Sequence, residues 1–157
     1  MTTIAYKNGF LASDTQMTDD HIRVPMRKLF LLGANAGCVA ICGDVERAMG
    51  FVAWLKAGAK PEEWKKKKYK DVGAIVIDKW DDLYWYDGGP HGVPIVGPYY
   101  AMGMGHVIAT AAMQQGASAM DAVRLAGSLD IYTNQDVEYY SIKTRKIKKY
   151  HPDKGTS

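Results

Sequence analysis

The chain has 157 residues, which is enough for one compact domain and too few for two of ordinary size. Its composition, 47% hydrophobic and 24% charged with a net charge of +3, excludes a disordered or collagen-like chain. We therefore predict a single domain over residues 1–150 and a short flexible tail over 151–157.

The longest apolar runs, residues 37–43 and 73–77, are much shorter than the roughly 20 residues that span a bilayer. We expect no membrane helix and no membrane partner. The first residues lack a basic segment followed by a long apolar one, so they do not resemble a secretory signal. A cytoplasmic protein is therefore expected.

Four strands are predicted before the first helix, over residues 3–6, 10–13, 28–32 and 37–42. The first two flank Asn8-Gly9, and this dipeptide between two apolar runs is the strongest short-range signal for a β-hairpin. The second two are joined by the turn-rich segment 33–36. The protein is therefore expected to begin with two hairpins.

Apolar residues at helical spacing predict helices over residues 45–57, 106–115 and 118–129. Asp44 is the expected N-cap of the first helix and Gly58 its stop. Gly116 is expected to end the second helix, and Ser118 with Asp121 resembles a capping box for the third.

Further strands are predicted over residues 72–77, 83–86, 99–102, 136–142 and 146–150. Residues 61–70 are read as a charged, solvated helix end or loop, and 88–98, rich in Gly and Pro, as irregular. Hairpins that are separated along the chain from the helices favour an α+β fold in layers.

Cys38 and Cys42 lie four residues apart in a predicted strand, which places them roughly 13 Å from each other. A disulfide needs Cα atoms within about 7 Å, so the two are not expected to pair. No second Cys or His pair stands at zinc-ligand spacing. Both are predicted to be buried thiols.

Two further groups of residues have an ordinary explanation. The aromatic residues at 84–86 and 99–100 are expected to pack in the core or between subunits rather than to hold a ligand. The basic tail, residues 143–154, carries no recognised nucleic-acid motif, and the net charge of +3 gives little support to a nucleic-acid partner.

Several short segments, taken in order, resemble the landmarks of the proteasome β-subunit family, and most closely its HslV-like bacterial branch. They are Thr2-Thr3-Ile4, Asn8-Gly9, Ala12-Ser13-Asp14-Thr15-Gln16, Lys28, Cys42-Gly43-Asp44, Gly103-Met104-Gly105 and residues 126–134. The resemblance runs over nearly the whole chain. It implies an α+β fold, a four-layer α-β-β-α sandwich of two antiparallel sheets, and the activity of an N-terminal threonine hydrolase.

In such an enzyme the first residue after processing is both nucleophile and base, and the resemblance gives this role to Thr2 after removal of Met1. A threonine hydroxyl is a weak nucleophile near neutral pH and needs an adjacent base. A free α-amine, with an ordinary pKa of about 7.7 to 8.0, can serve as that base.

The remaining catalytic residues follow from the same resemblance. Lys28 matches the lysine whose charge disfavours protonation of the neighbouring amine and hydroxyl, and Asp14 matches the acid that orients it. Gly43 matches the glycine whose amide stabilises the oxyanion. Asp130 and Thr133 match an acid–hydroxyl pair that supports the nucleophile.

The sequence departs from the family pattern at two places. The first hairpin is about two residues shorter in each strand, which keeps side chains on the same faces because strands have a period of two. Met104 stands where the family usually has a serine that hydrogen-bonds near the threonine amine, and a methionine side chain supplies no donor.

The resemblance also implies a substrate pocket for the residue before the cut bond. Counting along the chain places six apolar residues near it: Met17, Met26, Phe30, Ile41, Val45 and Met49. Cleavage after large apolar residues is therefore expected. No cofactor is required, but Gly127, Asp130 and Thr133 match positions whose backbone carbonyls hold a monovalent cation, often Na⁺, in HslV-like proteins.

Two functions remain open from the sequence. The first is a threonine endopeptidase that assembles into homo-oligomeric rings, works with an ATP-dependent unfoldase, and cleaves peptides or unfolded proteins. The second is a catalytically silent proteasome-like fold that serves as an assembly or structural protein, for example in a bacteriophage. Met104 favours the second function. The first is favoured by Thr2, Asp14, Lys28, Gly43, Asp130 and Thr133.

Overall fold

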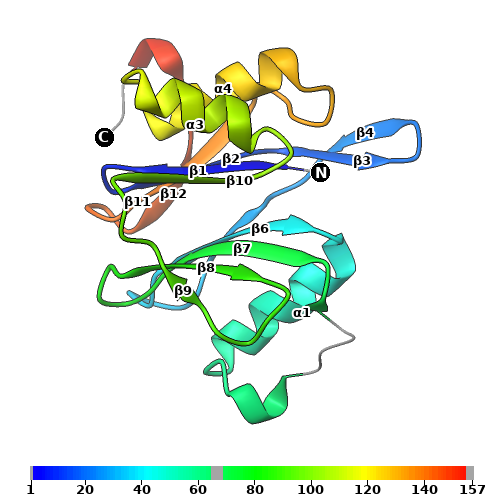
Figure 1. The fold of residues 1–157 in the computed structure, drawn as a ribbon, viewed down its shortest axis with the longest axis vertical. Helices are drawn as coiled ribbons and strands as arrows, with labels where there is room; N and C mark the ends of the chain where they lie inside the picture. The colour runs from blue at the N-terminus through cyan, green and yellow to red at the C-terminus, as the bar shows by residue number, and fades with distance from the viewer. Residues whose placement is uncertain (1, 65–68, 155–157) are drawn as a thin grey trace.

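The computed structural model describes residues 2–64 and 69–154. The chain folds into four layers: two helices, a first sheet, a second sheet, and a further helix (Figure 1). None of the helices in these two ranges is long and apolar enough to cross a membrane. The predicted four-layer α+β sandwich is confirmed.

The first sheet has five antiparallel strands in the order β10-β1-β2-β11-β12. These strands are β1 (Thr3–Lys7), β2 (Phe10–Asp14), β10 (Tyr99–Gly103), β11 (Val137–Ser141) and β12 (Lys146–Lys149). The turn between β1 and β2 holds Asn8 and Gly9 at φ values of 52° and 82°, which is the backbone that a two-residue Asn-Gly hairpin requires. The first predicted hairpin is confirmed.

The second sheet has five antiparallel strands in the order β5-β6-β7-β8-β9. These strands are β5 (Leu29–Leu31), β6 (Cys38–Gly43), β7 (Val72–Ile77), β8 (Leu83–Asp87) and β9 (Val93–Pro94). Apart from the short β9, the segment 88–98 is irregular, as predicted.

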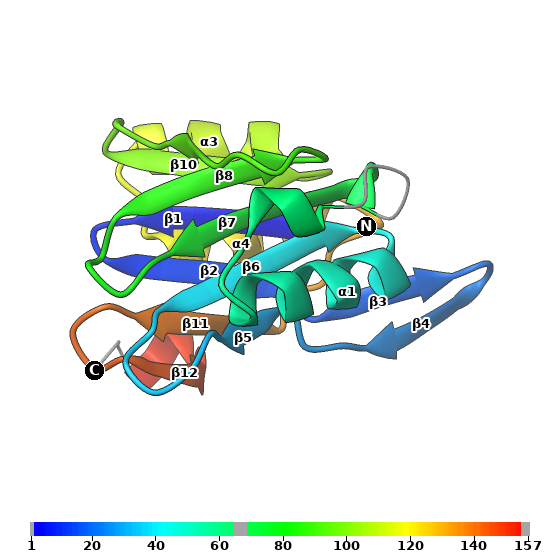
Figure 2. The same cartoon turned by 90° about the horizontal axis from the view of Figure 1, so that it is seen from below.

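Two helices, α3 (His106–Gln114) and α4 (Ala119–Leu129), cover the outer face of the first sheet, and α1 (Val45–Lys56) covers the outer face of the second (Figure 2). The Asp44 side chain caps α1 by accepting from the Arg47 amide, and Ser118 caps α4 by accepting from the Asp121 amide. Both predicted caps are confirmed.

Alternation along the central strands fills three separate cores. On β1, Ile4 packs between the two sheets while Ala5 packs under α3 and α4. On β7, Ile75 faces the inter-sheet core while Val76 packs against α1. A strand with a core on each side reads as an unbroken apolar run, which is why β6 and β7 stand out in the sequence.

One prediction was wrong: six strands, not four, precede α1. The additional pair is the two-stranded sheet of β3 (Gln16–Asp19) and β4 (Ile22–Pro25), which projects from the sandwich in Figure 1. Its outer part is exposed, so it lacks the alternation of buried and exposed residues that identifies a strand. Asp20, at φ 48°, makes its turn.

Residues 61–63 form a short 3₁₀ helix, as do residues 152–154 within the predicted C-terminal tail. The lysines at 65–68 and the last three residues of the tail lie outside the described residues, as does Met1.

Candidate active site

Thr2 and Thr3 are held where β1 meets the end of β10. The Thr2 carbonyl accepts the Met104 amide at 2.8 Å, and Thr3 pairs with Gly103. Gly103 has φ +94°, and a Cβ atom there would lie 1.9 Å from the Thr2 oxygen. Only glycine allows β10 to approach the start of β1 this closely.

Two pockets meet at Thr2 and share Cys42 and Gly43 at the end of β6. The smaller pocket, about 10 Å³, is also lined by Lys28 and Met26. The larger pocket, about 410 Å³, opens toward Met104 and the charged groups of Lys70, Asp71 and Asp87. Thr2 therefore lies between a narrow, mainly apolar recess and a wider, partly charged one.

A buried ion pair, Lys28 with Asp14, lies next to Thr2. The Lys28 ammonium lies 3.0 Å from each Asp14 oxygen, and Asp14 also accepts the Thr3 amide at 2.9 Å and the Gln16 amide at 3.1 Å. Asp14 is fully buried and Lys28 is 3% exposed. Three donor groups therefore hold this carboxylate through four hydrogen bonds, and the carboxylate in turn holds the lysine.

Burial acts on both members of the pair. It raises the pKa of the Asp14 carboxyl, while the charge of Lys28 and the hydrogen bonds from Lys28, Thr3 and Gln16 act in the opposite direction. It lowers the pKa of the Lys28 ammonium, against the attraction of Asp14. A lysine whose pKa is lowered gives up its proton more readily than an exposed one, a property often found in active sites.

The predicted acid–hydroxyl pair reaches Thr3. The Thr133 hydroxyl donates to Asp130 Oδ2 at 2.7 Å and lies 2.8 Å from Thr3 Oγ1. Thr3 was not among the residues selected from the sequence. The alternation of side chains along a strand could have identified Thr3, because the residue after Thr2 must point to the opposite face of the sheet.

The predicted substrate-pocket residues fall into two groups. Met26, Ile41 and Val45 line the small pocket with Thr2. The other three do not line this small pocket: Met17 is on β3, Phe30 packs toward the α1 core, and Met49 is 42% exposed on α1.

At the predicted cation position, Gly127 packs so closely that a Cβ atom would lie 2.2 Å from the Asn134 oxygen. The Asp130 carbonyl accepts the Thr133 amide at 3.2 Å, and its carboxylate accepts the Tyr132 amide and the Thr133 hydroxyl. These hydrogen bonds hold the turn that carries the predicted cation position.

Both cysteines are free, Cys38 buried and Cys42 half-buried, and no disulfide joins them. Burial raises the pKa of the Cys38 thiol to about 12 and that of Cys42 to about 11. Cys42 lines both pockets beside Thr2. An electrophile that enters the site therefore meets a thiol as well as a hydroxyl.

We predict that neither thiol of the native protein reacts with iodoacetamide at pH 8. A thiol with a pKa of about 11 is ionised only on the order of 0.1% at that pH, and the thiolate is the reactive form. Intact mass should show no adduct on native protein and two adducts after unfolding in urea. An adduct on the native chain would show that Cys42 is reactive.

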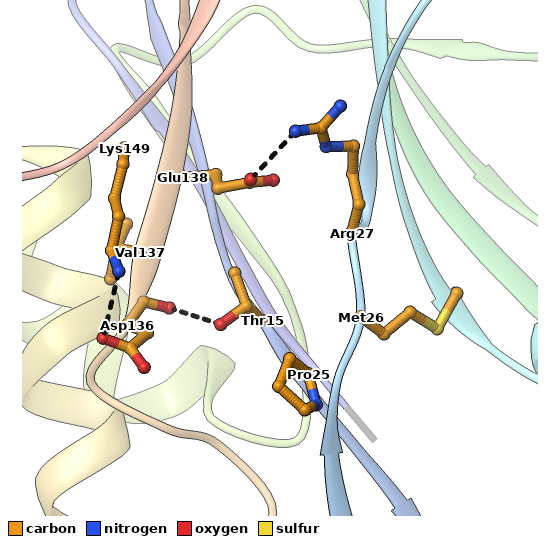
Figure 3. Close-up of a pocket in the computed structure, with 8 residues that line it drawn as sticks. All are labelled: Thr15, Pro25, Met26, Arg27, Asp136, Val137, Glu138 and Lys149. Carbon is orange, nitrogen blue, oxygen red and sulfur yellow. Dashed lines mark hydrogen bonds and ion pairs between the residues drawn. The ribbon is translucent and has the colours of Figure 1, made fainter.

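The largest of these three cavities by volume, about 520 Å³, is lined by Thr15, residues 25–27, residues 136–138 and Lys149, and does not include Thr2 (Figure 3). Arg27 pairs with Glu138 at 3.4 Å and Lys149 with Asp136 at 4.0 Å. Each basic side chain of this pocket therefore has an acidic partner in the same pocket. Met26, which points away from Asp136 in Figure 3, lines this pocket and the small pocket at Thr2.

Comparison with known proteins gives a match in structure alone. No protein-family model and no curated protein sequence matches the chain. The crystal structure of eukaryotic HslV from Trypanosoma brucei matches with a TM-score of 0.68, covering 89% of this chain and 98% of that one. The two share 18% sequence identity, so the comparison shows a common fold. The resemblance in fold to HslV-like proteins is thereby confirmed.

Proposed function

We propose that the protein is a threonine-type endopeptidase with Thr2 as its nucleophile after removal of Met1. One observation carries the proposal: Thr2 shares a pocket with Lys28 and Gly43, and the buried carboxylate of Asp14 holds Lys28 in place. The chain shares the proteasome-type fold of HslV, and this fold supports the proposal of a threonine-type endopeptidase.

The proposed reaction begins when the free α-amine of Thr2 accepts the proton of the Thr2 hydroxyl. The hydroxyl oxygen then attacks the carbonyl carbon of the scissile peptide bond. The oxyanion of the tetrahedral intermediate accepts a hydrogen bond from the Gly43 amide. Collapse breaks the C–N bond as the Thr2 ammonium gives its proton to the leaving amine. Water, deprotonated by the same amine, then hydrolyses the ester and regenerates Thr2.

Lys28 acts in this scheme through its charge. A cation beside the amine and the hydroxyl disfavours protonation of both, so more of the amine is free to act as a base. Asp14 keeps the ammonium in place through two contacts of 3.0 Å.

A second candidate function is the catalytically silent assembly protein, and one observation favours it. The Met104 side chain is 53% exposed beside the larger pocket and brings no hydrogen-bond donor there. The Met104 amide, in contrast, holds the Thr2 carbonyl. In the peptidase proposal, Met104 positions Thr2 through its backbone and leaves proton transfer to the α-amine.

The proposal extends to substrates and assembly. The small pocket contains Met26, Ile41 and Val45, so we infer an apolar residue before the cut bond, because a charge would lose its hydration there. Its present volume of about 10 Å³ holds about one water molecule, so a substrate side chain enters only if lining residues such as the flexible Met26 shift. We further propose cytoplasmic homo-oligomeric rings fed with unfolded protein by an ATP-dependent unfoldase.

The experiment that tests the function combines intact mass with labelling by a peptide epoxyketone that carries an apolar residue at the reactive end. We expect purified protein to lack Met1, to gain one inhibitor mass at Thr2, and to hydrolyse fluorogenic peptides. Thr2→Ala should lose both label and hydrolysis, whereas Thr2→Ser should keep the label. A homogeneous protein that keeps Met1 and takes no label would favour the silent fold.

A further inference from the structure

The hydrogen bonds of Thr3 connect the two predicted parts of the site. Its amide donates to Asp14 Oδ1 at 2.9 Å, and its hydroxyl lies 2.8 Å from Thr133 Oγ1. The Thr133 hydroxyl gives its only proton to Asp130 Oδ2, so the Thr3 hydroxyl must be the donor to Thr133. Thr3 is fully buried and thus lies at the head of a relay that ends on a carboxylate.

The relay runs on the helix side of the first sheet. Ala5, two residues along β1, packs under α3 and α4, and Thr3 points to that same face. Gly105 leaves room for the hydroxyl, because a Cβ atom there would lie 2.2 Å from Thr3 Oγ1. Thr2 instead lines pockets with Lys28 and Gly43 of the other layer.

We propose that Thr3 is a positioning residue for Thr2: its amide and hydroxyl clamp the start of β1 between the Asp14–Lys28 pair and the Thr133–Asp130 relay. This inference rests on the proposed function. After removal of Met1, Thr2 is the first residue, and the first residues of a domain fray unless they are tied down. The bonds of Thr3 and the Met104 amide supply that restraint.

Positioning matters here because one residue supplies both nucleophile and base. A displacement of about 1 Å in a reacting group costs roughly 100-fold in rate. The clamp does not contact the substrate, but it sets the position of the nucleophile and base in the transition state, so its loss should lower kcat and leave KM nearly unchanged.

The test compares wild type with Thr3→Val and Thr3→Ser in hydrolysis of a fluorogenic peptide, with thermal unfolding followed in parallel. Valine keeps the shape and β-preference of threonine but has no hydroxyl. Serine has the hydroxyl and lacks only the methyl group. For Thr3→Val we expect kcat to fall roughly 10- to 100-fold, with KM within about twofold. Thr3→Ser should recover to within about threefold of wild type.

Ser13→Ala is the matched control. Ser13 is fully buried next to Asp14, and its hydroxyl has no partner among the described residues. Its removal deletes a buried hydroxyl close to the site without touching the relay, so kcat should stay at the wild-type level.

Thr133→Val breaks the relay from its other end and carries the test if Thr3→Val does not fold. It should reproduce the loss of kcat, and Thr133→Ser should reverse it. Wild-type kcat in both valine variants, or Thr3→Ser as slow as Thr3→Val, would overturn the positioning role while the peptidase stands. A wild-type protein without hydrolysis or label would overturn the proposed function and this inference with it.

Discussion

Replacing Lys28 with methionine is expected to lower kcat for peptide hydrolysis roughly 10³-fold or more, because cooperating catalytic groups lose most of their effect when one is removed. Methionine keeps an unbranched apolar stem, so the variant deletes the charge with little change in shape. The matched control is Arg27→Met, whose side chain is 62% exposed in a long ion pair with Glu138. That variant should keep near-normal turnover.

The same Lys28→Met substitution should also lower the free energy of unfolding. It leaves Asp14 buried without its counter-ion, and breaking a buried pair in this way costs about 3 to 5 kcal/mol. Burial already raises the pKa of Asp14 against the opposing charge of Lys28, so removing that charge raises this pKa further.

A carboxyl whose pKa is raised on folding binds protons more tightly in the folded state. Its contribution to stability is therefore greatest at low pH and is lost as pH rises through the folded pKa. Lys28→Met should lose stability relative to wild type as pH rises above about 4, the ordinary pKa of an aspartate, as measured by urea unfolding at several pH values. A deficit that does not grow with pH, or near-normal hydrolysis, would remove Lys28 and Asp14 from their proposed roles.

Local signals predicted the elements, because each is decided by neighbouring residues. Asn8 and Gly9 adopt the positive φ values that their hairpin needs, and Asp44 and Ser118 cap the helices that follow them. The β3–β4 hairpin was missed because its residues face solvent on most sides, so no apolar period marks it.

The site was only partly predictable for the opposite reason: its geometry depends on contacts between distant residues. Resemblance selected Asp14, Lys28 and Thr133, but spacing along the chain cannot show that the Thr133 hydroxyl meets Thr3, 130 residues away. Spacing likewise placed Met49 near the substrate pocket, but Met49 is not among the residues that line the small pocket with Thr2. Counting residues fixes distance along the chain and leaves the direction of a side chain undetermined.

Gly103→Ala tests whether the close approach of β10 is what places Thr2. At φ +94° an alanine is strained by about 1 to 2 kcal/mol, and its Cβ would also lie 1.9 Å from the Thr2 carbonyl oxygen. Because that oxygen is backbone, the strands must separate to relieve the collision. We expect a loss of roughly 3 kcal/mol or more in the free energy of unfolding.

Gly58→Ala separates the effect of backbone strain from the effect of the collision with Thr2. Gly58 follows α1 at φ +103°, but a Cβ atom there meets no atom within 4 Å. It should therefore show the backbone strain alone, about 1 to 2 kcal/mol, with unchanged hydrolysis. Gly103→Ala should in addition lower kcat roughly 100-fold, because displacement of the Thr2 carbonyl moves the amine and hydroxyl of the same residue. Equal destabilisation of the two variants, with activity retained in both, would show that Thr2 is positioned independently of its contact with β10.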